Sequence, residues 1–223
     1  MKRKIAGVVL VLLLAVAAIS PIAVSRTTRV ILLMHSMGVI AAEFFPMMER
    51  FEELGIAVDV AAGVTGPYTF WEDSFECFNC TPIGSLDVAL TIDDVDLQLY
   101  DALLLAPGFA HSFWLEPGRR RGIELLNEAA EQGMLLGGIS WSVWTLLGQG
   151  LLDGRTACEW PHPLGILKPS LHWSGFLSNF DVDFVENCVW TDLGQADQPT
   201  IITANHSCPE LFADAIAKAL GVE

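Results

Sequence analysis

Apolar residues follow two kinds of spacing along the chain after residue 28. Short runs without polar positions predict strands, and apolar residues that recur every three to four positions predict helices. Residues 63–94 are rich in Gly, Pro and aromatic residues and carry no long periodic pattern. Strands that are apolar throughout and alternate with helices are typical of a parallel sheet covered on both faces. The predicted strands are 29–34, 56–61, 101–106, 134–139, 156–160, 184–190 and 200–204, and the predicted helices are 41–54, 119–132 and 208–220.

The first 25 residues form a separate segment. Lys2, Arg3 and Lys4 precede an uncharged, strongly apolar stretch at residues 5–25. About 20 apolar residues can span a bilayer, and a basic start followed by an apolar stretch and small residues also describes a secretory signal. Residues 1–25 are therefore predicted to be a signal peptide or a transmembrane anchor, and their length favours the anchor. Either way the basic cluster stays in the cytoplasm, so residues 26–223 are expected to be an extracytoplasmic domain, membrane-anchored or secreted, with membrane contact through residues 5–25.

The domain is strongly acidic. Without the three basic residues of the N-terminal segment, nine Lys and Arg stand against 27 Asp and Glu, which leaves a formal charge of −18. Such a domain is repelled by nucleic acid phosphates, so no nucleic acid partner is expected.

The five cysteines limit the choice of metal and redox chemistry. Cys77 and Cys80 form one C-x-x-C pair, which is half of a zinc site, and the chain has no second pair with ligand spacing. No metal or cofactor is therefore predicted. Exported proteins keep disulfides, so a local Cys77–Cys80 disulfide is favoured, with a redox-active pair as the alternative. The odd number of cysteines leaves at least one without an intramolecular partner.

Ser140 stands where a strand meets a helix. It directly follows the apolar run 134–139, and residues 141–147 are typical of the first turns of a helix. A side chain on such a sharp turn is held out of the sheet, beside the backbone N–H groups that begin the helix, which suits attack on a carbonyl. The spacing Gly138-x-Ser140-x-Ser142 matches the G-x-S-x-G pattern in part. Ser140 is either a nucleophile or a small residue that a tight junction requires.

The order of motifs resembles the DJ-1/PfpI family, whose fold is that of the class I glutamine amidotransferases. Residues 100–108 (YDALLLAPG) are similar to the family's YDALxLPGG, and residues 150–155 (GLLDGR) are similar to its GLLxGR. Strand 30–34 followed by Gly38 and Glu43, and strand 201–203 followed by the last helix, complete the pattern. The resemblance implies an α/β, flavodoxin-like three-layer sandwich with a mostly parallel sheet over residues 26–223.

The resemblance also implies roles for residues at one site. Ser140 replaces the family's nucleophilic cysteine, Trp141 stands where many members have a histidine, and Glu43 matches the glutamate that contacts the nucleophile. The backbone N–H groups of Phe109 and Trp141 would be the oxyanion donors. A serine, unlike a cysteine, needs a base to remove its proton as it attacks. Glu43 is the first candidate for that base, and His111 and His206 follow sheet strands and are further candidates.

Two functions are compatible with these residues. The first is an exported hydrolase, a peptidase or amidase or an aldehyde-processing enzyme, which acts on a small molecule or a peptide through Ser140 and Glu43. The second is a catalytically inactive binding module that keeps the DJ-1/PfpI fold. The resemblance further implies that the chain could form a homodimer.

Overall fold

The computed structural model describes residues 26–34, 39–71, 82–107, 119–158 and 181–222. The proposed signal or anchor at residues 1–25, the Cys77–Cys80 pair, Phe109 and His111 lie outside these ranges. Within the described ranges, no helix combines the length and the apolar character that a membrane crossing requires.

A seven-stranded sheet forms the centre of the domain, in the order β11-β12-β8-β7-β1-β3-β6. All its neighbouring strands are parallel except β11, which runs antiparallel to β12. The prediction of a mostly parallel sheet is therefore confirmed. Its strands are β1 (Arg29–Met34), β3 (Ala57–Ala62), β6 (Leu90–Thr91), β7 (Ala102–Leu105), β8 (Leu135–Ile139), β11 (Val189–Asp192) and β12 (Ile201–Ala204).

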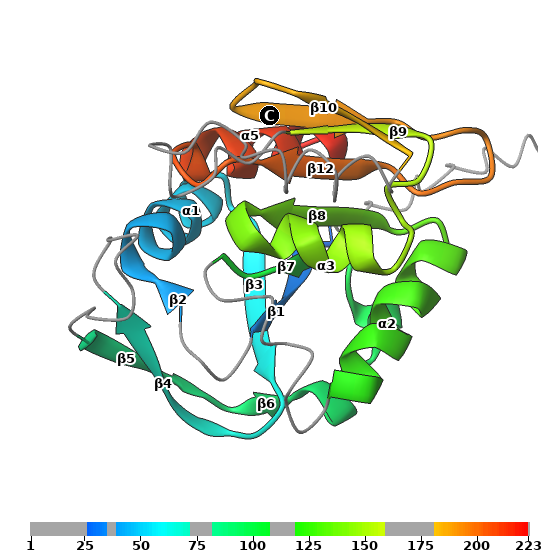
Figure 1. Cartoon of the computed structure of the whole chain (residues 1–223). Coiled ribbons are helices and arrows are strands. Elements are labelled where there is room, and N and C mark those ends of the chain that lie inside the picture. Colours follow the sequence, from blue (N-terminus) through cyan, green and yellow to red (C-terminus); the bar gives the residue numbers. More distant parts are fainter. Residues whose placement is uncertain (1–25, 35–38, 72–81, 108–118, 159–180, 223) are drawn as a thin grey trace, which may run out of the picture.

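Helices cover both faces of this sheet and give the three layers seen in Figure 1. On one face, Val30 and Leu32 of β1 pack with Phe51 and Phe212 in one buried cluster. On the other face, the alternate residues of β1 join a second cluster with Leu125 and other helix residues. Because side chains alternate along a strand, the wholly apolar β1 supplies both clusters. The covering helices are α1 (Ala41–Glu53) and α5 (Pro209–Ala219) on the first face, and α2 (Arg119–Glu131) and α3 (Val143–Gly148) on the second.

Two stretches differ from the predictions. Residues 63–94 contain strands, because β4 (Gly66–Trp71) pairs with β2 (Val39–Ile40) and β5 (Pro82–Val88) in a separate three-stranded sheet. The predicted strand 184–190 is wrong, because it is divided between β10 (Val182–Val185), which pairs with β9 (Arg155–Cys158), and β11 of the central sheet. The residues between β10 and β11 are exposed, so the chain leaves one sheet there before it enters the other. The remaining short elements are the 3₁₀ turns η2 (Ile92–Asp94), η3 (Leu97–Leu99) and η5 (Ser140–Ser142).

The GLLDGR motif is a turn that ends in a buried arginine. Gly150 and Gly154 have φ values of 70° and 72°, a region in which glycine is favoured over residues with a Cβ. Arg155 follows, with a side chain that is only 6% exposed. Its Nη1 donates to Asp192 Oδ1 at 3.2 Å and to the Pro199 carbonyl at 2.9 Å. The motif therefore connects β9 to β11 and to the loop that leads into β12.

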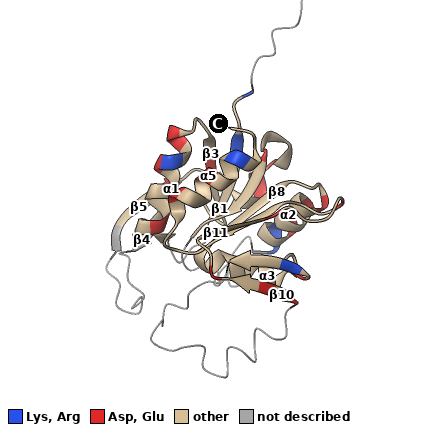
Figure 2. Cartoon of the chain, turned by 90° about the horizontal axis from the view of Figure 1, so that it is seen from above, with Lys and Arg blue, Asp and Glu red and all other residues tan. Residues whose placement is uncertain are grey.

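The described arginines are already engaged by acidic side chains. Each arginine whose side chain the structure describes forms an ion pair with Asp or Glu, and Figure 2 shows further acidic residues over helices and loops. The excess of negative charge therefore remains largely uncompensated on the surface. Exposed pairs such as Arg120–Glu124 contribute only about 0–1 kcal/mol each to stability.

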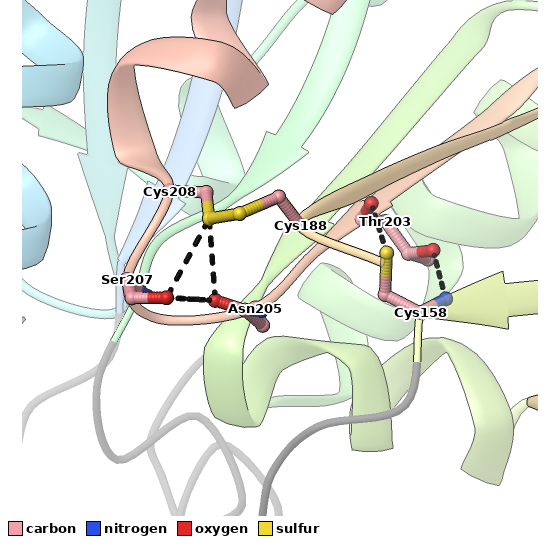
Figure 3. The surroundings of a disulfide bond; sticks show 6 residues. All are labelled: Cys158, Cys188, Thr203, Asn205, Ser207 and Cys208. Atoms are coloured by element: carbon pink, nitrogen blue, oxygen red, sulfur yellow. Dashed lines mark hydrogen bonds between the residues drawn. A yellow bond between two sulfur atoms is a disulfide. The ribbon is translucent and has the colours of Figure 1, made fainter. Parts of the chain in front are cut away.

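A disulfide joins two cysteines that the sequence did not single out. Cys188, just before β11, is bonded to Cys208, the residue that precedes α5 (Figure 3). A backbone hydrogen bond joins the same two segments, because the Asn205 N–H donates to the Cys188 carbonyl at 3.0 Å. The disulfide thus attaches the antiparallel edge strand to the loop between β12 and α5. Among the described cysteines, Cys158 is the free thiol, and it is buried.

This disulfide is expected to stabilise the domain, because it closes a ring across 20 residues of sequence. Closing a ring of that size stabilises a protein by about 3 kcal/mol through the entropy of the unfolded chain. For a domain of this length the double variant Cys188→Ser/Cys208→Ser should therefore melt about 6–12 °C lower. Thermal unfolding measured by circular dichroism tests this expectation. Wild-type protein in reductant is the control and should melt close to the variant, whereas a variant that melts with the oxidised wild type would contradict the prediction.

Candidate active site

Ser140 lies on a sharp turn between β8 and the helix that follows it. Its φ is 61°, and it is the one described residue other than glycine with a positive φ. Ser140 begins η5, and α3 continues directly from that turn. An L-residue in the left-handed region costs about 1–2 kcal/mol, and such strain persists only where the surroundings enforce it. Residues 138–142, hereafter the elbow, therefore form the sharp strand-to-helix turn that the sequence predicted.

A glycine before Ser140 lets the helix fold back against the strand. A Cβ added to Gly138 would lie 2.9 Å from Leu146 Cδ1 and 3.2 Å from Ser142 Oγ. The first of these atoms ends a side chain, so a larger residue at position 138 would require the Leu146 side chain to move and would crowd the Ser142 hydroxyl. The small residue at this position thus lets Leu146 and Ser142 pack closely against β8.

Glu43 contacts Ser140 although the two residues are far apart in the sequence. Ser140 Oγ donates a hydrogen bond to Glu43 Oε1 at 3.2 Å, although the residues are 97 positions apart. The two side chains are buried, with 2% of Glu43 and 1% of Ser140 exposed. A buried carboxyl group is rare without a structural or functional partner. The structure therefore brings together the two residues that the family resemblance assigned to catalysis.

The sheet topology explains this meeting. Strands β8, β7 and β1 are neighbours and parallel, so their carboxyl ends lie at one edge. The elbow follows β8 at that edge, and α1 with Glu43 in its first turn follows β1 through β2. Ligand sites of open parallel sheets lie at this edge.

Of the other predicted site residues, the structure describes Trp141 and His206. Trp141 is the second residue of the elbow's 3₁₀ turn, so its backbone N–H belongs to the group that begins the helix. His206 lies in the loop after β12, and the last residue of β12, Ala204, pairs with Ile139. That loop therefore starts beside the elbow. Phe109 and His111 belong to the part of the chain that the structure leaves undescribed.

Cys158 is close to this edge of the sheet but is a poor substitute nucleophile. Its N–H donates to Thr203 Oγ1 at 2.8 Å, and its Sγ donates to the Thr203 carbonyl at 3.1 Å (Figure 3). Burial raises the pKa of the Cys158 thiol to about 11, against smaller opposite effects of hydrogen bonds from Thr203 and the Trp190 backbone. Since the thiolate is the reactive form, Cys158 stays protonated and inert near neutral pH. Within the described residues, no group of three or more His, Cys, Asp or Glu side chains could hold a metal ion.

Comparison with known proteins agrees with the flavodoxin-like α/β fold. Residues 28–216 match the model of the DJ-1/PfpI family, and the chain belongs to this family. No curated protein sequence matches the chain.

Solved structures of the same superfamily share the fold at low sequence identity. DJ-1beta of Drosophila melanogaster aligns with a TM-score of 0.65 at 17% identity, over 89% of this chain and 92% of its own. A ThiJ/PfpI domain protein from Brachyspira murdochii aligns with a TM-score of 0.63 at 16% identity, over 88% of this chain and 98% of its own. DJ-1 of Schizosaccharomyces pombe gives 0.61 at 14% identity, over 86% and 92%. These likenesses concern the fold alone.

The strain at Ser140 can be measured by comparing two substitutions. Ser140→Ala and Ser140→Gly both remove the hydroxyl group, and they differ in their tolerance of a positive φ. The glycine variant should be the more stable by about 1 kcal/mol, because relief of left-handed strain exceeds the added entropy of the unfolded chain. Urea unfolding of both variants measures this difference. An alanine variant as stable as the glycine variant would show that the backbone at position 140 is not held at positive φ.

Proposed function

We propose that this chain is an exported or membrane-anchored hydrolase of the DJ-1/PfpI family, with Ser140 in place of the usual cysteine nucleophile. The observation that carries the proposal is the 3.2 Å hydrogen bond from Ser140 Oγ to Glu43 Oε1, made at a strained elbow. A hydroxyl directed at a carboxylate has an acceptor for the proton that it must lose as it attacks. The substrate class that fits is a small molecule or peptide with an amide carbonyl, and aldehyde processing is the second chemistry to test.

The proposed reaction has two steps, acylation of Ser140 and hydrolysis of the acyl-serine. Ser140 Oγ attacks the carbonyl carbon while its proton passes to Glu43, and the carbonyl oxygen takes up negative charge. The leaving amine then departs with that proton and leaves an acyl-serine. Water attacks the acyl group in the second step and gives its proton to Glu43, and Ser140 Oγ recovers a proton as the acid product leaves. A carboxylate with the usual pKa of about 4 is a weak base for this task, but burial penalises its charged form and thereby favours proton uptake.

The oxyanion would be stabilised by backbone groups. The N–H of Trp141 stands at the start of η5, next to Ser140, and the N–H of Phe109 would be the second donor. Backbone donors do not depend on side-chain identity, so replacing the nucleophile leaves this part of the machinery intact in principle. His206, in the loop beside the elbow, is the described histidine that could supply a second base.

The alternative function is a binding module without catalysis. The observation that favours it is the burial of Ser140, which exposes 1% of its surface. The neighbouring Trp141 and Trp144 are partly exposed, and such side chains could contact a ligand instead. Labelling of Ser140 separates the two functions.

A serine-directed fluorophosphonate should label wild-type protein at Ser140, because the reagent reports an activated hydroxyl. Ser140→Ala should abolish the label, and Glu43→Gln should slow labelling by about 10²-fold or more, as loss of a member of a catalytic unit does. Ser85→Ala, which removes an exposed hydroxyl on β5, is the matched control and should label like wild type. Peptide mass spectrometry identifies the labelled residue. Folded wild-type protein that stays unlabelled would contradict the hydrolase and favour the binding module.

Export is proposed from two features that agree. Residues 2–25 have the basic and apolar parts of a signal or anchor, and a disulfide such as Cys188–Cys208 is expected in oxidising compartments. The disulfide is independent of the N-terminal pattern, which strengthens the argument.

A reporter that is active only in the cytoplasm should be silent when fused after Glu223. The expected reason is that the basic cluster at residues 2–4 stays inside while the domain crosses the membrane. The matched control is the same fusion without residues 2–25, which should be active. Full activity of the complete fusion would refute the extracytoplasmic location.

A further inference from the structure

Ser142 makes two hydrogen bonds to a single residue of the sheet. Its Oγ accepts from the Ile139 N–H at 2.7 Å and donates to the Ile139 carbonyl at 2.7 Å. Its side chain has no exposed surface, and it is the third residue of η5. Two short bonds at one buried hydroxyl are a specific attachment, because the same oxygen must accept from and donate to one residue.

The position of Ile139 explains why such an attachment is useful. In an extended residue the N–H and the carbonyl point to the same side of the strand, so one hydroxyl can reach both. The register between β7 and β8 ends at the Leu105–Gly138 pair, one residue before Ile139. Ser142 therefore satisfies two backbone groups at the place where the strand ends, where buried groups need partners.

The attachment encloses the strained residue. Ile139 and Ser142 flank Ser140 and Trp141, so the two bonds close a short ring around the residue with a φ of 61°. The packing of Gly138 brings the same hydroxyl close, because a Cβ at that position would lie 3.2 Å from Ser142 Oγ. The Ser142 hydroxyl therefore holds the backbone on both sides of Ser140, which would otherwise move to a less strained φ.

We propose that Ser142 is a positioning residue of the elbow, whose hydroxyl keeps the side chain at position 140 directed at Glu43 and beside the N–H groups of η5. Its importance for catalysis rests on the proposed function of Ser140, but its effect on the elbow is a separate claim. That effect can be measured with a cysteine at position 140. The pKa of its thiol reports how well the nearby N–H groups stabilise an anion, whether or not the natural serine is a nucleophile.

The experiment compares three variants of the full chain: Ser140→Cys, Ser140→Cys/Ser142→Ala and Ser140→Cys/Thr145→Val. Thr145 is the matched control, because it is also buried, at 1% exposure, and its Oγ1 has no hydrogen-bond partner in the described part of the chain. The rate of iodoacetamide reaction at position 140 is followed against pH and assigned by peptide mapping, which separates it from the buried Cys158. Glu43 on α1 and His206 after β12 are the described ionisable groups near the elbow, and all variants keep them.

The first variant should titrate below the ordinary thiol pKa of about 8.5, since helix-start N–H groups stabilise a thiolate and buried Glu43 takes up the proton instead of opposing that charge. Ser142→Ala in that background should raise the midpoint by about one unit, which slows alkylation at pH 7 roughly tenfold. Thr145→Val should leave the midpoint unchanged. A role limited to global stability would lower the melting temperature of the Ser142→Ala variant without moving its midpoint, and that result would overturn the proposal.

Two further outcomes are decisive. If Ser140→Cys alone titrates like an ordinary thiol, the elbow does not present its N–H groups, and the proposal fails. If the Ser142→Ala variant does not fold, Ser142→Gly removes the same hydroxyl and takes its place, with the same expectations. Absence of fluorophosphonate labelling in the wild type would refute the proposed function while the thiol titration still decides the role of Ser142.

Discussion

The backbone of Ser140 is held at a positive φ, a conformation that residues with a Cβ avoid. The strands and helices on both faces of the sheet pack around this residue. The strain of about 1–2 kcal/mol is maintained from both faces of the sheet. Gly138 lets α3 pack against β8 on one face, and Gly137 contacts Phe212 of α5 on the other, where an added Cβ would lie 2.8 Å from its ring. The elbow is therefore held by packing against α3 on one face of the sheet and α5 on the other, and a substrate or ligand would meet a site that is formed before binding. Such preorganisation is what stabilisation of a developing charge requires.

The central sheet could be predicted from the sequence because its strands carry their own signal. In β1, Val30 and Leu32 face one helix layer and Ile31 and Leu33 face the other, so the strand is apolar on both sides. The small sheet β2-β4-β5 could not be predicted in the same way. Its strands contain Gly66, Pro67 and Gly84, residues that disfavour strands locally, and pairing with distant segments stabilises them. The division between β10 and β11 was missed for a related reason, since an apolar run does not reveal which sheet each half joins.

The site could be predicted in part. Ser140 and Glu43 followed from the resemblance and the elbow pattern, and their hydrogen bond confirms that they are neighbours. The Cys188–Cys208 disulfide had no such signal, because cysteine spacing alone does not determine pairing. The antiparallel pairing of β11 with β12 in the central sheet brings these two residues together. In the sequence, Ser142 differed from the glycine that ends the G-x-S-x-G pattern, and nothing there indicated a role for its hydroxyl. Its two bonds to Ile139 show that the hydroxyl supplies hydrogen bonds that a glycine at that position could not.

The replacement of cysteine by serine changes what the remaining site must do. A cysteine at an elbow can be held as an anion by N–H groups and the helix dipole alone, so the base need not act during attack. A serine keeps its proton until the transition state, and the acceptor of that proton becomes decisive. Glu43 is already within hydrogen-bond distance of Ser140, but a carboxylate is a weaker base for a serine than a histidine would be. Activity of the hydrolase would therefore depend on how strongly burial of Glu43 favours its neutral form, whereas a binding module would need the same hydrogen bond only to satisfy a buried carboxyl group.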